Sequence, residues 1–404
     1  MNYVGTARPI HDAKGKATGY SKYAGDISLP NMAYLCMLHS KIPHGYVKAV
    51  HAEKALALPG VYGVYHCLNT TDRKYNRYRS NFDQSYLPNE ECAFNDYVRF
   101  VGDKIGVVAA CDQETAERAA RLVEVEYEEL PFSIGFDDTL AGKNCLDGET
   151  PVRDEYELDV GEKQGNAEGL IEVCSTMELP RLHHATMETH ACIADYDPYS
   201  DMLTVYCPNQ AVHGIRTVLA DFLEMPESHV RVVKATMGGS FGAKQEWFLE
   251  PVTALVAKKL CRPVKLVYSR GEAMTDTIVR GAMRMSARGY YMPDGEMKEI
   301  YCDVTLDAGA YIGNAGDYVR ALAGKPTRCY RIPYMHYHGQ VISSNSPVSG
   351  AFRSWSAAEE ALMMERQLDA AAEKLGMDRL AIRLKNVARS GEEDKKLRLS
   401  LEDI

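Results

Sequence analysis

The sequence lacks the features that identify several large classes of protein. Its apolar runs are much shorter than the roughly 20 residues that a membrane-spanning helix requires. No basic flank with an apolar core follows Met1, as a signal peptide would have. The net charge is −10, and Lys and Arg form no basic cluster. The sequence therefore indicates neither a membrane nor a nucleic acid as a partner.

The cysteines include no Cys-x-x-Cys pair, although there are 11 of them between Cys36 and Cys329. An odd, scattered set is typical of reduced and mostly buried thiols, so we expect a cytoplasmic protein without a disulfide framework. Clustered thiolates that would hold zinc or an iron–sulfur cluster are also missing. Redox cofactors of those kinds are therefore expected on another chain.

The remaining composition is that of a folded protein with more than one domain. The 404 residues are 46% hydrophobic and 25% charged, which suits two or three domains. Short strands alternate with helices up to about Leu130, and a stretch rich in Gly, Asp, Asn and Pro follows. We therefore predict a first domain at residues 1–130, a linker at 131–158 and a second domain at 159–404.

Local patterns place several elements within these domains. Asp112 is a suitable N-cap for a helix whose alanines recur at helical spacing. The expected strands of the first domain are 33–38, 61–65 and 105–110, and the expected helices of the second domain are 215–223, 246–260 and 357–375. The second domain thus mixes strands with helices.

The most informative segment runs from Val232 to Lys244, where a β-branched strand enters a cluster of glycines and a helix follows. Glycines between a strand and a helix let the main chain approach a ligand, and they point N–H groups at an anion near the helix start. Pro251 is awkward inside a helix, so the regular helix is expected to begin near Glu250. An ordinary tight turn without a ligand is the alternative, and the spacing alone leaves both open.

The glycine spacing fails two familiar nucleotide-binding templates. A Walker A loop has Gly directly before Lys, whereas Ala243 separates Gly242 from Lys244. The dinucleotide fingerprint, two glycines one residue apart followed by a third, is also missing. A nicotinamide-dependent dehydrogenase would further need a ribose-binding acid, and none is evident. This class of function is therefore disfavoured.

Motifs occur in a fixed order along both domains. The first domain carries Tyr-Ala-Gly-Asp at 23–26, Pro-His-Gly at 43–45, Leu-Pro-Gly-Val at 58–61 and Val-Arg-Phe-Val-Gly-Asp at 98–103. The second carries His184, Met187-Glu188, Gln210, the glycine segment and Ser-Gly-Ala-Phe-Arg at 349–353. In this order they resemble the molybdopterin-binding subunit of the xanthine dehydrogenase / aldehyde oxidase family of molybdenum hydroxylases. The resemblance implies an α+β fold, a small α/β hammerhead domain followed by a mixed α+β molybdopterin-binding domain.

The resemblance also implies an activity and a set of cofactors. Family members hydroxylate an electron-poor carbon with oxygen from water, and electrons leave through iron–sulfur clusters to flavin. We therefore expect a molybdopterin cofactor on this chain, in a dinucleotide form, and 2Fe-2S and FAD on partner subunits. Because the pterin supplies the sulfur ligands of the molybdenum, no residue of this chain is expected to bind the metal directly.

The sequence departs from the family at one point. Single-chain members carry a second molybdopterin domain with a Gly-x-Gly-Glu motif, whose glutamate is the general base. That motif is missing from this sequence, and the stretch 397–404 falls where the family's two halves join. We therefore expect a second molybdopterin subunit that carries the catalytic glutamate. A truncated, inactive product or a non-catalytic scaffold is the alternative.

Five residues match the cofactor-binding positions of the family. Gly239, Phe241 and Gly242 would place main-chain amides beside an oxo ligand of the molybdenum. Gln210 would hydrogen-bond a molybdenum ligand, and Arg353 would lie beside the cofactor. Without the resemblance, Gln210 is an exposed loop amide and Arg353 is a surface ion-pair partner.

Three positions bear on the substrate. Arg320 matches the arginine that purine-oxidising members aim at a substrate carbonyl, where a guanidinium stabilises charge on a heterocycle or clamps a carboxylate. Gln245 stands where xanthine-oxidising members have a second glutamate, and an amide cannot supply that negative charge. Trp355 matches an aromatic residue that stacks on the substrate ring. The plain alternatives are a surface ion pair for Arg320 and core packing for Trp355.

Arg320 and Gln245 are accordingly the candidate catalytic residues, and with Trp355 they are the candidate substrate-binding residues. A purine or a nicotinate-like acid suits this set best. Simple aldehydes need no such arginine, and an aldehyde-oxidising member of the same family is the alternative.

Three further positions complete the expectations. For His184 and Glu188 we expect a hydrogen-bonded structural pair. Ser354 occupies the position where carbon monoxide dehydrogenases carry a cysteine for copper. That activity is therefore disfavoured.

Overall fold

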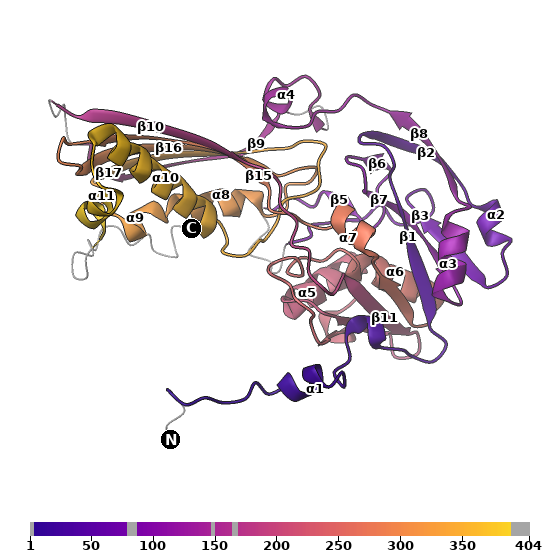
Figure 1. The fold of residues 1–404 in the computed structure, drawn as a ribbon. Coiled ribbons are helices and arrows are strands. Elements are labelled where there is room, and N and C mark those ends of the chain that lie inside the picture. Colours follow the sequence, from indigo (N-terminus) through magenta and orange to yellow (C-terminus); the bar gives the residue numbers. More distant parts are fainter. Residues whose placement is uncertain (1–3, 79–86, 147–149, 164–168, 389–404) are drawn as a thin grey trace.

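The computed structural model of this chain describes residues 4–78, 87–146, 150–163 and 169–388. Its architecture is α+β, as predicted. Figure 1 shows two bodies side by side, one built on a seven-stranded sheet and one on a five-stranded sheet covered by the long helix α10 (Ala357–Leu375). None of the helices in the described ranges is long and apolar enough to cross a membrane.

The seven-stranded sheet joins the two predicted domains. Its strand order is β13-β12-β11-β14-β1-β7-β3. Strand β1 (Ala33–His39), from the first domain, pairs in parallel with β14 (Val264–Val267), from the second. The other strands are β3 (Val61–His66), β7 (Lys104–Ala110), β11 (Ala191–Asp197), β12 (Met202–Cys207) and β13 (Val230–Lys234). One sheet therefore runs through both predicted domains.

Helices cover this sheet where its strands are fully buried. Strand β7 is buried at every position because it lies between β1 and β3 and is covered on both faces. Helix α3 (Gln113–Ala120) packs on β1 and β7, and Asp112 accepts a hydrogen bond from the N–H of Thr115, which confirms the predicted N-cap. Helix α6 (Glu250–Leu260) packs on β11 and carries Pro251 in its first turn, so it begins where predicted.

Shorter elements fill the rest of this body. An antiparallel sheet has the strand order β6-β2-β8, and a second pair of strands, β4 and β5, is also antiparallel. The bounds are β2 (Gly45–His51), β4 (Lys74–Tyr75), β5 (Glu91–Cys92), β6 (Tyr97–Val98) and β8 (Glu124–Glu129). The helices are α1 (Ala13–Ala17), α2 (Glu53–Leu56), α5 (Val212–Phe222) and α7 (Arg270–Thr275), with single turns of 3-10 helix at Ala24–Asp26 and Glu227–His229.

The five-stranded sheet forms the second body. Its order is β10-β15-β16-β17-β9, with bounds β9 (Val152–Gly161), β10 (Ile171–Leu179), β15 (Ala282–Tyr291), β16 (Met297–Asp307) and β17 (Tyr334–Ile342). Helix α10 packs on β10 and β15, and helix α8 (Ala315–Ala323) packs on β17 and β9. The short helices α9 (Pro326–Cys329) and α11 (Arg379–Asn386) adjoin α10. Buried and half-buried residues alternate in β17, as expected for a sheet with one covered face.

The segment predicted as a linker, residues 131–158, contains more structure than a linker. It holds the short helix α4 (Phe136–Leu140), and β9 begins within it at Val152. Acidic residues alternate with apolar ones along β9, a pattern of period two that the Gly- and Asp-rich surroundings obscured. At the other end, residues 389–404 of the predicted second domain, including 397–404, lie outside the described residues.

Candidate functional site

The glycine cluster after β13 turns back on itself. Gly239 has a φ of +97° and Gly242 of +104°, conformations that glycine adopts without strain, and Phe241 between them has a φ of +55°, which residues with a side chain rarely adopt. A side chain at Gly242 would collide with the carbonyl oxygen of Ala351. Glycine is therefore required at this position, because the loop of residues 238–244, here called the loop wall, packs its main chain against the main chain of 351–352.

The loop wall leaves main-chain donors open. Within the described ranges, the N–H groups of Gly239, Phe241 and Gly242 donate to no protein acceptor. The next two N–H groups are satisfied inside the loop, since Ala243 donates to the carbonyl of Ser240 at 2.9 Å and Lys244 donates to the hydroxyl of Ser240 at 3.0 Å. Open donors of this kind bind an anion or an oxo group.

Glu188 holds the two ends of the loop wall together. Its Oε2 accepts a hydrogen bond from the N–H of Gly238 at 2.7 Å and another from Nζ of Lys244 at 2.6 Å. The side chains of Glu188 and Lys244 are only 14% and 2% exposed, and burial lowers the pKa of Lys244 below its usual value. We call this arrangement the clasp, because it fixes the distance between the first and last residues of the loop.

Gln210 lies at the edge of the same loop. Its main-chain N–H donates to the carbonyl of Lys244 at 2.8 Å, and its side-chain Oε1 accepts from the hydroxyl of Ser240. Because Oε1 already accepts this hydrogen bond, the NH₂ group of the side chain is the part of Gln210 that can donate to a ligand. Gln210 is exposed, so a ligand can reach this group.

Two histidines, buried His190 and half-buried His184, support the site from behind. His190 donates from Nε2 to the carbonyl of Ala243, and His184 donates from Nε2 to the carbonyl of Ala351, each at 2.8 Å. Because a carbonyl oxygen only accepts, Nε2 carries the proton in both rings. Burial lowers the pKa of both to about 4, so both are neutral at pH 7. The predicted pair of His184 with Glu188 is wrong, since each has another partner.

Residues 351–356, here called the aromatic wall, face the loop wall. The guanidinium of Arg353 lies 6.0 Å from the centroid of the Phe241 ring, which brings two predicted cofactor residues together. Ser354, Trp355 and Ser356 then have φ angles of +86°, +45° and +63°. Three successive non-glycine residues in the left-handed region are strained, and such strain is found at functional sites.

Two predicted substrate residues, Trp355 of the aromatic wall and Arg320 of α8, are held by other parts of the chain. The ring of Trp355 stacks on Tyr78 at a centroid distance of 6.2 Å and tilts against Tyr318 of α8 at 5.2 Å. Arg320, also on α8, donates from Nη1 and Nη2 to the carboxylate of Asp154 at 2.7 and 2.8 Å. The plain alternative for Arg320, an ion pair, is therefore present, and its role toward a substrate stays a prediction.

Gln245 and Glu246 follow the loop wall, and Glu246 connects it to the aromatic wall. Gln245 is half-buried, and its N–H donates to the carbonyl of Gly242 at 3.0 Å. The Oε1 of fully buried Glu246 lies 3.4 Å from the N–H nitrogen of Ala351 and 3.4 Å from Nδ2 of Asn314. Burial raises the pKa of Glu246 to about 8, so this carboxyl joins the walls without carrying a charge at neutral pH.

Sequence reasoning missed four residues that shape the site: Ser240, Lys244, His190 and Glu246. Lys244 and Glu246 gave a signal, because ionisable residues in a run of glycines and apolar residues need a partner when buried. Ser240 and His190 gave none, because their partners lie 30 and 53 residues away in the sequence.

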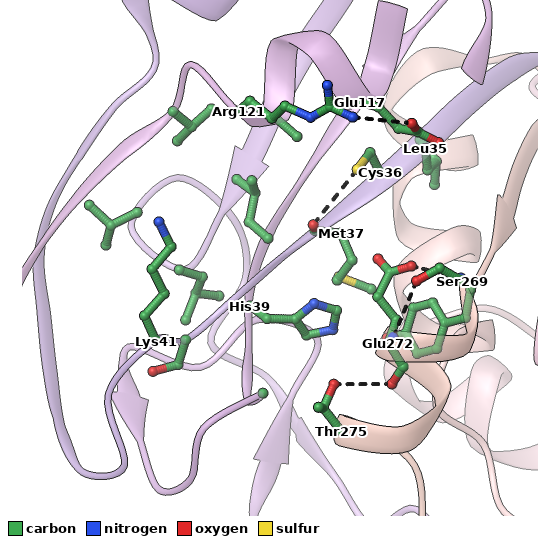
Figure 2. A pocket seen from close by; sticks show the side chains of 18 of the residues that line it. Leu35, Cys36, Met37, His39, Lys41, Glu117, Arg121, Ser269, Glu272 and Thr275 are labelled. Atoms are coloured by element: carbon green, nitrogen blue, oxygen red, sulfur yellow. Dashed lines mark hydrogen bonds and ion pairs between the residues drawn. The ribbon is translucent and has the colours of Figure 1, made fainter. Parts of the chain in front are cut away.

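A large cavity lies elsewhere, between β1, α3 and α7 (Figure 2). Its volume is about 1410 Å³, and its lining contains none of the predicted site residues. Burial raises the pKa of the Cys36 thiol on its wall to about 12, so this thiol is not a nucleophile at neutral pH. His39 on the same wall is hydrogen-bonded to Asp276 at 3.1 Å. The loop wall with its open donors is therefore the better candidate site.

Both parts of the chain match known family models. Residues 18–131 match the aldehyde oxidase and xanthine dehydrogenase a/b hammerhead domain, and residues 152–387 match the molybdopterin cofactor-binding domain. The chain belongs to the xanthine dehydrogenase / aldehyde oxidase family of molybdenum hydroxylases. The resemblance found in its sequence is thereby confirmed.

Individual members of this family align along nearly the whole chain. The nicotinate dehydrogenase large molybdopterin subunit of Eubacterium barkeri is 30% identical, and the alignment covers 94% of this chain and 88% of that subunit. The xanthine dehydrogenase molybdenum-binding subunit of Escherichia coli O157:H7 is 31% identical, with 94% of this chain and 51% of that one covered. The aldehyde oxidoreductase structure from Desulfovibrio gigas superimposes with a TM-score of 0.88 at 26% identity, over 96% of this chain and 44% of that one. The chain thus spans about half the length of some relatives.

The donor set of this molybdenum hydroxylase chain fits a molybdopterin cofactor. The pterin group is anionic and rich in oxygen, and the two walls present open N–H groups together with the cation of Arg353. The carboxyl groups close by do not oppose an anion, because Glu246 is protonated and Glu188 is paired with Lys244. The face that the two walls share, here called the mouth, therefore has the chemistry of an anion site.

Proposed function

We propose that this chain is the molybdopterin-binding subunit of a molybdenum hydroxylase that acts on an electron-poor carbon of an N-heterocycle, a purine or a nicotinate-like acid. When bound, the molybdenum cofactor supplies the two-electron oxidation of that carbon, with water as the source of oxygen. We further propose that 2Fe-2S and FAD on partner subunits accept the electrons, and that the pterin is in a dinucleotide form.

The observation that carries this proposal is the set of open donors on the loop wall. In the proposed complex, the N–H groups of Gly239, Phe241 and Gly242 bind oxygen atoms of the cofactor. Arg353 adds a charge-assisted bond, and the NH₂ group of Gln210 donates to a ligand of the metal. The clasp keeps the three N–H groups converged before the cofactor arrives, so little ordering is needed on binding.

The substrate assignment rests on Trp355, Gln245 and Arg320. A flat heterocycle would stack on Trp355 in place of Tyr78. Gln245 can both donate and accept, but it leaves the site without a second negative charge. A carbonyl or carboxylate of the substrate would compete with Asp154 for one edge of the Arg320 guanidinium. The names of the nicotinate and xanthine dehydrogenase relatives support these two substrate classes.

The general base is proposed to lie on a second molybdopterin subunit. The E. barkeri protein supports this division, because this chain covers 88% of a protein that is itself named a large molybdopterin subunit. A carboxylate supplied across the mouth would take the proton from the attacking water. All 11 cysteines of this chain are free thiols, which supports the proposal of a cytoplasmic location.

Metal and pterin analysis tests the proposal. The chain is co-expressed with the products of its neighbouring genes and purified as a complex. Molybdenum and pterin in a ratio near one per chain are expected. Bound NAD would instead indicate a nicotinamide-dependent dehydrogenase, and the absence of all three would indicate a scaffold.

The substrate class is tested with Arg320→Ala in the same complex. Loss of one charge-assisted bond of about 3 kcal/mol should cut kcat/KM for a carboxylate- or carbonyl-bearing heterocycle by about 100-fold. Turnover of a neutral aldehyde should change much less. Arg379→Ala, at an exposed ion pair on α11, is the matched control. Equal losses on both substrates would favour an aldehyde-oxidising enzyme.

A further inference from the structure

Residues 4–22 form an arm that projects from the body of the molecule (Figure 1). All of these residues are exposed apart from Gly15 and Ser21, which are half-buried. Three of the exposed side chains are large and apolar: Val4 is 97% exposed, Ile10 is 74% exposed and Tyr20 is 85% exposed. The arm thus presents apolar surface to solvent along its length, and the body of the chain does not cover it.

The helix within the arm is too short to stand alone. Helix α1 has five residues, AKGKA, and none of them is buried. Isolated helices shorter than about 12 residues are marginal in water, and the glycine in the middle weakens this one further. The ordered shape of the arm is therefore expected to depend on a surface outside this chain.

The arm starts beside the loop wall. Tyr23, at its root, pairs with Thr236 in a parallel β-bridge. Thr236 precedes Gly238 by two positions in the sequence, and β13 is the last strand of the seven-stranded sheet. The root of the arm is thus attached to the segment that leads from β13 into the loop wall, next to the mouth between the walls. Whatever protein covers the mouth lies within reach of an arm of 19 residues.

The mouth itself has apolar surface to be covered. Met187 is 93% exposed and Phe241 is 51% exposed. Gly239 lies between them, because a Cβ placed on it would be 3.3 Å from the Phe241 ring and 3.8 Å from the side chain of Thr186, the residue before Met187. Phe241 is already assigned to the cofactor, whereas Met187 has no role in the proposed chemistry. Exposed apolar residues at the mouth and along the arm fit one continuous interface.

The charge of the arm indicates what kind of surface it would bind. The arm carries Arg8, Lys14, Lys16 and Lys22 against the single carboxylate of Asp12, in a chain whose net charge is −10. Lys16 is paired with Asp12 at 2.6 Å. Lys14 and Lys22 add two more positive charges, which suit a partner surface that is apolar with acidic side chains around it.

We propose that the arm docks on the subunit that completes the cofactor pocket and holds it over the loop wall. This inference rests on the proposed function, since it requires a second molybdopterin subunit. An arm of 19 residues approaches the roughly 20–30 residues that one side of a standard protein interface contains. Most of the arm also precedes residue 18, where the match to the hammerhead model begins.

The experiment uses the complex of this chain with the Gly-x-Gly-Glu-bearing chain encoded in the same genome. Two variants are compared with the wild type, a deletion of residues 4–18 and the double substitution Ile10→Ser/Tyr20→Ser. The matched control is Tyr199→Ser, because Tyr199 is 99% exposed in the turn between β11 and β12 and lies on no part of the arm. The dissociation constant of the two chains, the molybdenum content and the unfolding midpoint of the isolated chain are measured.

Both arm variants should weaken the complex at least about tenfold, because large apolar anchors contribute most of the binding energy of an interface. The molybdenum content of the complex should fall as the affinity of the two chains falls. The unfolding midpoint of the isolated chain should stay unchanged, since the arm packs on little of the body, and Tyr199→Ser should alter none of the three measurements.

The contrary outcomes are distinguishable. Unchanged affinity in both arm variants, with molybdenum present in the wild type, overturns the arm proposal and leaves the proposed function standing. Loss of a dimer of this chain, with unchanged affinity for the second subunit, also overturns it and assigns the arm to a second copy. A wild-type chain without molybdenum, or a genome without a Gly-x-Gly-Glu chain, overturns both.

Discussion

The loop wall and the aromatic wall are built in opposite ways. On the loop wall the hydrogen bonds lie behind the loop, where Glu188, Ser240 and His190 hold it, and the donors in front stay open. The groups that would meet a substrate are already in contact with the chain: Trp355 of the aromatic wall contacts two tyrosines, and Arg320 of α8 is bonded to Asp154. The first wall is ready for a ligand, whereas the second must exchange contacts to receive one.

The difference matches the demands of the two ligands. A cofactor that stays bound through many turnovers benefits from a rigid, preorganised donor set, because no ordering cost opposes its affinity. A substrate that must leave after each turnover can bind by displacing an internal partner. Changes in the loop wall should therefore affect cofactor content and stability, and changes in the aromatic wall should affect the choice of substrate.

Gly242→Ala should break the loop wall most severely. The new side chain would meet the carbonyl of Ala351 and would force a residue with a Cβ into a φ of +104°. Strain and overpacking together should cost about 4 kcal/mol of unfolding free energy. Molybdenum should be lost as well, as measured by metal analysis of the complex.

Gly25→Ala is the matched control for that change, because no atom lies within 4 Å of a Cβ at Gly25. It should leave both stability and molybdenum content near the wild-type values. Full molybdenum content in Gly242→Ala would show that the tight contact of the two walls is not needed for the cofactor.

Glu188→Ala should open the clasp. It leaves the ammonium of Lys244 buried without its carboxylate partner, which should cost about 3 kcal/mol of unfolding free energy in chemical denaturation. The double variant Glu188→Gln/Lys244→Met removes both charges and should recover most of that stability. Molybdenum content should stay low in the double variant if the clasp positions the N–H groups, and recovery of both quantities would reduce the clasp to a stability element.

Glu246→Gln should change how the free energy of unfolding depends on pH. The folded-state pKa of about 8 lies above the usual 4.5, so the folded chain binds more protons than the unfolded chain between these values. This contribution is complete below pH 4.5 and is lost as the pH rises through 8, by at most about 1.4 kcal/mol per pH unit. A glutamine does not titrate, so this loss of stability is missing from the variant. In urea titrations, the free energy of unfolding of Glu246→Gln should therefore rise relative to that of the wild type between pH 5 and pH 8.

Exposed Glu53→Gln is the control for that comparison, because Glu53 lies on α2, outside both walls. A constant difference between Glu246→Gln and the wild type at pH 5, 6.5 and 8 would contradict the assignment of a protonated carboxyl between the walls.

Gln245→Glu should give the smallest and most selective effect. A carboxylate at this position would supply the negative charge that we expect xanthine oxidation to need, and it should move the ratio of kcat/KM for purine over nicotinate upward by roughly tenfold. Competition assays with both heterocycles measure the ratio. An unchanged ratio would mean that this side chain does not face the substrate ring.

The fold was predictable where local patterns are strong. The sequence predicts the bounds of the 357–375 helix correctly, because a long amphipathic period is a local signal. It also predicts the start of the 250–260 helix, because a proline marks a first turn. The pairing of β1 with β14 was not foreseen, because it joins residues more than 200 positions apart. Strand β9 was hidden by a composition typical of loops.

The same division applies to the candidate site. The glycines were conspicuous because the loop conformation requires them, and Arg353 does lie near Phe241. The supporting contacts could not be read from the sequence, because Glu188, His190 and Gln210 reach the loop across 30 to 56 positions. Arg320 is bonded to Asp154, and its role toward a substrate stays a prediction.

The shared sheet has a consequence for dissecting the molecule. Strand β1 lies between β14 and β7. The part of the chain before Pro131 and the part after Pro151 are therefore held together by main-chain hydrogen bonds as well as by the stretch that connects them. A protease that nicks this stretch should leave both fragments eluting as one particle. Residues 1–130 produced alone should be insoluble, because the edge of β1 that normally pairs with β14 would be exposed and would pair with strands of other molecules.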